Sequence, residues 1–302
     1  MDTGLKTAMI KFMLRSLIKT MRPKQWAKSI FLFTAIVFDR QLFNLNALWH
    51  TVAGFMVFSL LASTIYIIND LGDIEADRQH PKKKHRPIPA GDLPVPVAIA
   101  AAIIIWLIVF PTAFWLSTGF GLICVIYLLG NLIYSRWLKH IALLDVLLLA
   151  SFYVLRVAAG VALIEVSRFS PWLYVFTIFI ALYLGIGKRR AEIVSAQENG
   201  GSTRKVLENY TLPFLDQLIS IVLTISILTY SLYTFSAPNL PPNNSMMLTI
   251  PFMIYIIFRY LYLLQVEGHG ESPEDILFGD RPLQAAIVLW GIAILVIFYL
   301  FQ

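Results

Sequence analysis

Long apolar runs dominate the chain from about residue 26 to its end, and short polar segments separate them. A transmembrane helix needs about 20 predominantly apolar residues. The pattern predicts nine membrane-spanning helices, at residues 26–44, 47–68, 94–116, 119–138, 141–164, 171–187, 213–236, 246–265 and 282–301. The first is the weakest, because Asp39 and Arg40 interrupt its end. We therefore expect an all-α polytopic protein whose residues 1–302 form a single integral membrane domain.

Residues 1–25 follow a different pattern, in which basic side chains such as Lys11, Arg15 and Lys19 alternate with apolar ones. A cleavable signal peptide would have an uninterrupted hydrophobic core, and none is evident here. The segment is typical of a basic amphipathic helix that lies on the membrane surface.

Composition agrees with the span pattern, since 58% of the 302 residues are apolar or aromatic, 14% are charged, and the mean hydropathy is +0.72. These values exclude an ordinary soluble enzyme and a disordered chain. The single cysteine, Cys124, lies in an apolar run, so no intrachain disulfide can form. We expect it to be a small buried apolar residue.

The net charge of +6 is explained by topology. With nine spans, 20 of the 24 Lys and Arg residues fall on one side of the membrane. The positive-inside rule then predicts a multi-pass protein of the inner (cytoplasmic) membrane, with its N-terminus and longer loops in the cytoplasm. We expect no nucleic-acid partner, because the basic residues are not interleaved with aromatic ones as in a strand-binding groove.

Acidic residues gather where the second span ends. If the helix continues to Pro81, then Asn69, Asp73 and Asp77 are spaced i, i+4, i+8, and Asp70 lies on the same face. Like charges at this spacing repel one another, and a bound cation removes that cost. Carboxylate and amide oxygens suit Mg²⁺, which is commonly shared between carboxylates and substrate phosphates. The stripe therefore predicts a magnesium site; the alternative is a solvated acidic helix end.

A basic run follows the acids directly, from Lys82 to Arg86, and Pro87, Pro89 and Gly91 give it the character of a shaped loop. Mg²⁺ can bridge acid to phosphate while Lys or Arg neutralises the remaining oxygens. The pairing of acids and bases predicts a site for a metal-bound diphosphate.

The motif Asn69-Asp70-x-x-Asp73-x-x-x-Asp77 at the end of a second span resembles the UbiA superfamily of intramembrane prenyltransferases. This resemblance implies a nine-helix UbiA-type bundle with a cytoplasm-facing polar cavity, and an acidic motif that binds Mg²⁺ and a diphosphate. A second acidic motif normally follows the sixth span. Here that place holds Gly187-Lys188-Arg189-Arg190-Ala191-Glu192, one acid among three bases.

This departure points to one branch of the superfamily, the polyprenyl-phosphate phosphoribosyltransferases. Four blocks of the sequence resemble that branch and occur in the same order: Arg22-Pro23-Lys24-Gln25-Trp26-Ala27-Lys28, Asn69 to Gly91, Gly185 to Arg189, and Glu271 to Arg281. The branch implies transfer of 5-phosphoribose from 5-phosphoribosyl-1-diphosphate (PRPP) to a polyprenyl (decaprenyl-like) phosphate, with release of diphosphate.

The candidate catalytic residues are Asn69, Asp70, Asp73 and Asp77, of which Asn69, Asp73 and Asp77 are the expected Mg²⁺ ligands. Basic candidates for binding the donor's phosphates or the lipid phosphate are Lys28, Lys84, Arg86, Lys139, Lys188 and Arg189. The loops 69–93 and 188–212 are expected to form the cytoplasmic active-site loops.

Three further substrate-binding candidates each have a plainer alternative. Tyr134, at the end of the fourth span, either faces the diphosphate or is an interfacial tyrosine. Arg156, inside the fifth span, either contacts a ligand or pairs with another polar side chain. Glu192 either completes a metal site or pairs with Lys188.

Two other functions stay open. One is an ordinary prenyltransferase that moves a prenyl group to an aromatic acceptor. The other is a transporter or lipid flippase, although transporters usually carry charges or helix breaks near the midplane of corresponding halves. The sequence also leaves a homo-oligomer open.

Overall fold

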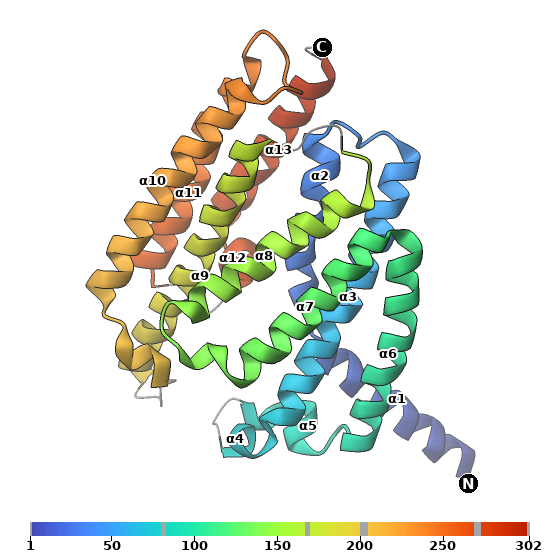
Figure 1. Cartoon of the computed structure of the whole chain (residues 1–302). Coiled ribbons are helices and arrows are strands. Elements are labelled where there is room, and N and C mark those ends of the chain that lie inside the picture. Colours follow the sequence, from blue (N-terminus) through green and yellow to red (C-terminus); the bar gives the residue numbers. More distant parts are fainter. Residues whose placement is uncertain (1, 80–82, 167–169, 200–204, 269–272, 301–302) are drawn as a thin grey trace.

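The computed structural model describes residues 2–79, 83–166, 170–199, 205–268 and 273–300, and within these ranges the regular secondary structure is entirely helical (Figure 1). Eight of its helices are long and apolar enough to cross a membrane. These are α3 (Leu45–Gly72), α6 (Val95–Leu116), α7 (Thr118–Arg136), α8 (Leu144–Leu163), α9 (Pro171–Asn199), α10 (Leu212–Ser236), α11 (Ile250–Gln265), which η5 (Ser245–Thr249) precedes, and α13 (Arg281–Leu300). The predicted all-α polytopic fold is confirmed.

The other helices lie before or between these spans, and all of them except α1 are short. They are α1 (Asp2–Met21), η1 (Pro23–Leu32), α2 (Phe33–Phe38), α4 (Ile74–Gln79), η2 (Lys83–His85), α5 (Pro87–Ala90), η3 (Leu138–His140), η4 (Lys205–Asn209) and α12 (Pro273–Gly279). Figure 1 shows α4 and α5 at one end of the bundle, where α1 also leads in from the N-terminus. The predicted basic segment 1–25 thus consists of α1 and the start of η1.

The first predicted span, 26–44, is the one that does not form a long α-helix. Its residues form the 3₁₀ helix η1 followed by the short α2, and Arg22, directly before Pro23, adopts a left-handed conformation (φ 53°). A 3₁₀ helix rises about 2.0 Å per residue, so η1 and α2 together extend about 30 Å, which is the thickness of the hydrocarbon core. The segment can therefore cross a bilayer with fewer residues than an α-helix needs.

The two larger of three hydrophobic clusters among the described residues lie on either side of α8, and a smaller one packs Ile67 of α3 against Ile88, Leu93, Ala98 and Ala102. One core gathers buried residues of α9, α10, α11 and α13, and the other gathers buried residues of α3, α6, α7 and α8. Val146 near the start of α8 belongs to the first core and Phe152 to the second. Because α8 packs against both α7 and α9, polar groups at its start can contact both halves of the protein.

The basic segment after the sixth span differs from the prediction. We expected a loop from 188 to 212, but α9 continues through Lys188 and Arg189 to Asn199. Gly200 and Gly201 follow in the sequence. Residues 200–204, like 80–82 and 269–272, lie outside the described residues, and with them Lys82 of the predicted basic run and Glu271 of the last block that carries the resemblance.

One close approach fixes how η1 crosses α8. A Cβ built on Gly160 would overlap the carbonyl oxygen of Leu32, a backbone atom that cannot move as a side chain can. Leu32 and Ala159 are also buried in the same core. Only glycine at position 160 lets the two elements approach this closely.

We predict that Gly160→Ala lowers the free energy of unfolding by about 1–3 kcal/mol, as overpacking a tight contact does. Thermal denaturation in detergent measures the effect. Gly291→Ala is the matched control, because no atom lies within 4 Å of a Cβ at that position of α13. Equal melting temperatures for the two variants would contradict the assigned contact.

Candidate active site

Two of the acidic residues form a buried cluster with basic side chains at the end of α3. Asp70 accepts from Arg22 Nη2 at 2.6 Å and from Arg86 Nη1 at 3.1 Å. The same Arg86 nitrogen donates to Asp77 Oδ2 at 2.6 Å, and Lys83 Nζ lies 3.8 Å from Asp77 Oδ1. One guanidinium therefore draws two carboxylates together, while both arginines remain about 30% exposed. We call these five residues the acidic cluster.

The four residues of the expected stripe differ in burial. The helix is interrupted at Asp73 (φ −105°, ψ 14°), although backbone hydrogen bonds still run from Asp73 N–H to the Asn69 carbonyl and from Asp77 N–H to the Asp73 carbonyl. Asp70 and Asp77 are buried and share Arg86, whereas Asp73, between α3 and α4, is exposed.

A second polar cluster surrounds Arg189 on α9. Its Nε donates to Asp145 Oδ2 at 2.6 Å, Nη1 donates to Glu192 Oε2 at 2.7 Å, and Nη2 donates to the Tyr134 hydroxyl at 2.9 Å. The side chains of Arg189 and Asp145 are both fully buried. Since each of its nitrogens already donates to a protein group, Arg189 is held as an internal crosslink between α7, α8 and α9.

Tyr210 completes this Arg189 cluster from the segment between α9 and α10. Its hydroxyl donates to Asp145 Oδ1 and accepts from the Leu143 backbone N–H, both at 2.6 Å. Burial and the neighbouring Asp145 carboxylate raise the pKa of Tyr210 to about 12, so that it stays a neutral donor. Leu143 has φ 68° and ψ −43°, an unfavourable conformation for a branched residue, and strain of this kind persists only where the surroundings enforce it.

Neighbouring residues at the end of α7 connect the two clusters. Tyr134 accepts from Arg189, and the hydroxyl of Ser135 donates to Asn69 Oδ1 at 2.6 Å. Asn69 is adjacent to Asp70 of the acidic cluster. The ends of α3, α7 and α9 and the start of α8 therefore meet in one polar region, at the end of the bundle where α4 and α5 lie (Figure 1).

The remaining candidates lie at different depths. Lys84 is exposed in η2; Lys28, Lys139 and Lys188 are half-buried in η1, η3 and α9. Arg156 is buried, and its Nη2 donates to the Tyr127 hydroxyl at 2.7 Å. Glu192 pairs with Arg189.

Five residues of this region are not among the site residues expected from the sequence. Arg22 and Lys83 stand in blocks that carry the family resemblance, and Asp145 is conspicuous as an ionisable residue inside a predicted span. These three could have been chosen on those grounds. Ser135 and Tyr210 carry no such signal, because their role depends on partners that only the fold brings close.

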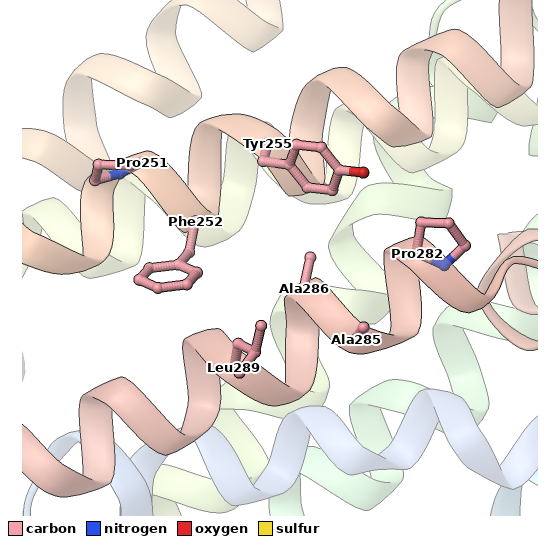
Figure 2. Close-up of a pocket in the computed structure, with 7 residues that line it drawn as sticks. All are labelled: Pro251, Phe252, Tyr255, Pro282, Ala285, Ala286 and Leu289. Atoms are coloured by element: carbon pink, nitrogen blue, oxygen red, sulfur yellow. The ribbon is translucent and has the colours of Figure 1, made fainter.

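Two surface cavities lie away from this region. Figure 2 shows an apolar groove of about 430 Å³ between α11 and α13, lined by Pro251, Phe252, Tyr255, Pro282, Ala285, Ala286 and Leu289. A second cavity of about 410 Å³ has polar residues including Gln41, His50 and Glu165. Neither contains any residue of the acidic cluster or the Arg189 cluster.

The oxygen donors near the acidic cluster suit a magnesium ion that arrives with a diphosphate. Mg²⁺ commonly takes one or two carboxylates together with substrate phosphates and waters. Asp73 forms no ion pair with the described residues, and Asn69 supplies an amide oxygen. Within the described ranges no three His, Cys, Asp or Glu side chains converge as a ready-made metal site. Phosphate oxygens would therefore have to complete the coordination.

We predict that Asp145→Asn destabilises the protein by about 3 kcal/mol, because it leaves the buried Arg189 charge without its main partner; the retained Glu192 contact limits the loss. Unfolding followed by intrinsic fluorescence measures the change. Asp216→Asn is the matched control, since its pair with Arg190 is partly exposed and contributes at most about 1 kcal/mol. A smaller loss for Asp145→Asn than for Asp216→Asn would refute the crosslink.

Comparison with known proteins agrees with this arrangement. The model of the UbiA prenyltransferase family matches residues 29–188. Decaprenyl-phosphate phosphoribosyltransferase of Mycobacterium tuberculosis is 33% identical over 90% of this chain and 91% of its own length. The Corynebacterium glutamicum protein of the same name is 32% identical over 94% of this chain and 87% of its own length.

Solved structures show the same fold. A UbiA homolog from Archaeoglobus fulgidus, bound to GPP and Mg²⁺, superposes with a TM-score of 0.70 over 94% of this chain and 99% of its own, at 19% identity. A UbiA homolog from Aeropyrum pernix K1 gives a TM-score of 0.56. The family model matches more than half of the chain, and the helical bundle is the one seen in the solved UbiA homologs. The chain therefore belongs to the UbiA prenyltransferase family.

Proposed function

We propose that this member of the UbiA transferase family is a Mg²⁺-dependent phosphoribosyltransferase that moves 5-phosphoribose from PRPP to a polyprenyl phosphate. The observation that carries the proposal is the charge of the site. Arg22, Lys83 and Arg86 surround the two buried acids, and the second acidic motif of the superfamily is replaced by the Arg189 cluster. A donor with a 5-phosphate besides its diphosphate requires more positive charge than a prenyl diphosphate does.

The curated relatives support the same donor and acceptor, since the mycobacterial and corynebacterial proteins are named decaprenyl-phosphate phosphoribosyltransferases. Their identity of about one third extends over most of this chain. The A. fulgidus homolog was solved with Mg²⁺, which supports a divalent cation in the family. We further propose that the acceptor has a decaprenyl-like length. The protein would lie in the cytoplasmic membrane, with the acidic cluster facing the cytoplasm.

We assign the residues two kinds of role. Asn69, Asp73 and Asp77 would hold Mg²⁺, and Asp70 would orient Arg22 and Arg86. Lys28, Lys84, Arg86, Lys139 and Lys188 would bind phosphate oxygens of the donor or the acceptor. Tyr134, Arg189 and Glu192, first chosen as substrate contacts, are better suited to position α7 and α9, because they already bond one another.

In the proposed reaction an oxygen of the acceptor phosphate forms a bond to C1 of ribose as the bond from C1 to the diphosphate oxygen breaks. The bonding electrons leave with diphosphate. Bound Mg²⁺ would neutralise charge that builds up on this leaving group. Arg22, Lys83 and Arg86 can exchange their carboxylate contacts for phosphate contacts, which stabilises the same charge. The acceptor phosphate is already ionised, so no general base is required.

The direct test is incubation of the purified protein with Mg²⁺, labelled PRPP and polyprenyl phosphates of several lengths, with identification of the lipid product. We expect a phosphoribosylated lipid and released diphosphate. A parallel assay with a prenyl diphosphate and an aromatic acceptor tests the prenyltransferase alternative. An assay of lipid movement across vesicle membranes without PRPP tests the flippase alternative. Turnover only with the prenyl donor, or Mg²⁺-independent lipid transport alone, would reject the proposal.

Asp73 offers the cleanest test of metal binding, because its exposed carboxylate forms no ion pair with the described residues. We expect Asp73→Asn to reduce transfer about 100-fold or more, as losing one electrostatic stabiliser of a transition state does, and to leave the melting temperature unchanged. Glu75→Gln is the control on the adjacent helix; Glu75 is 82% exposed and pairs only weakly with Arg78 at 3.1 Å. Equal turnover by the two variants would disprove the role of Asp73.

A further inference from the structure

A buried arginine without an acidic partner lies deep in the bundle. Arg156 on α8 is 4% exposed, and no described Asp or Glu pairs with it. Nη1 donates to the Phe152 carbonyl and Nη2 to the Tyr127 hydroxyl, both at 2.7 Å, while the buried Nε has no hydrogen-bond partner. A charge in such surroundings is expensive unless another group compensates it.

Aromatic rings surround the guanidinium of Arg156. Its central carbon lies 5.0 Å from the ring centre of Tyr127, 5.5 Å from that of Tyr153 and 5.6 Å from that of Phe58. Each such contact contributes about 0.5–2 kcal/mol, and the three together hold the guanidinium in one place. They leave its net positive charge unneutralised, so the site attracts an anion.

The position of Arg156 relates it to the acidic cluster. It lies 11 residues beyond Asp145 on α8, and its side chain turns back one helical turn to reach Phe152. With a rise of 1.5 Å per residue, the charge is about 10 Å further into the membrane than Asp145. Asp145 itself connects through Arg189, Tyr134 and Ser135 to Asn69.

We propose that Arg156 binds the phosphate of the lipid acceptor and holds it beneath the donor. This inference rests on the proposed function. A nucleophile must approach C1 from the side opposite the leaving group. If diphosphate is bound at the cytoplasmic end by the acidic cluster, the acceptor phosphate lies on the interior side of C1. Arg156 supplies positive charge on that side, inside the apolar bundle.

A neighbouring hydroxyl fits an oxyanion. Tyr127 already accepts from Arg156 and keeps its own hydroxyl proton for another acceptor. The ligand class is therefore a phosphate monoester on an apolar chain.

The test separates binding of the two substrates. We expect Arg156→Gln to weaken binding of labelled polyprenyl phosphate about 10- to 100-fold, as loss of a charged hydrogen bond does, with KM for PRPP changed less than about twofold. Arg156→Lys should retain part of the affinity. Uncharged polyprenol, which has the same tail, should bind wild type and Arg156→Gln equally. Arg259→Gln is the matched control, an arginine in α11 whose partner is Asp280 at 2.7 Å.

Two results would overturn the inference: unchanged lipid-phosphate binding by Arg156→Gln, or a raised KM for PRPP with normal lipid binding, which would assign Arg156 to the donor's 5-phosphate. If Arg156→Gln fails to fold, Arg156→Lys and Tyr127→Phe are measured by the same binding assay, and wild-type affinity in both would refute the site. Failure of the proposed function looks different, because wild type itself would then form no product from PRPP and polyprenyl phosphate.

Discussion

The cost of placing charge inside an apolar bundle governs how this protein is organised. Arg189 and Asp145 are both fully buried, and the guanidinium is stable there because Asp145, Glu192 and Tyr134 accept all of its donated bonds. Those partners come from three different long helices. The pair therefore fixes the relative positions of α7, α8 and α9, and everything at the polar end of the bundle depends on that arrangement.

The acidic cluster obeys the same constraint in a different way. Its acids are neutralised by arginines that are about one third exposed, and these contacts can be exchanged for contacts with an anionic ligand. Arg189, by comparison, is fully buried, and each of its three side-chain nitrogens donates to a protein group. The acidic cluster can therefore exchange partners, whereas the Arg189 cluster holds the helices in place. Tyr134 and Ser135, adjacent residues on α7, connect the two clusters.

The shared bundle of the UbiA family explains why the polar groups lie at one end. Apolar side chains in contact with lipid leave little room for charge along the spans. Arg189 and Asp145 are compensated by each other, whereas Arg156 is surrounded by aromatic rings.

The sequence by itself determined the membrane fold, eight long spans and the region of the candidate site, because apolar run length and charge placement are local properties. The end of α9 differed, since the helix continues to Asn199. Only the tertiary structure decided which charges pair. Helical spacing put Asn69, Asp70, Asp73 and Asp77 on one face, and the fold buried Asp70 and Asp77 against Arg86 while it left Asp73 exposed. Arg189 was expected to meet phosphate, and its partners Asp145 and Tyr134 lie 44 and 55 residues away. Pairing over such separations depends on how helices pack, which no local pattern records.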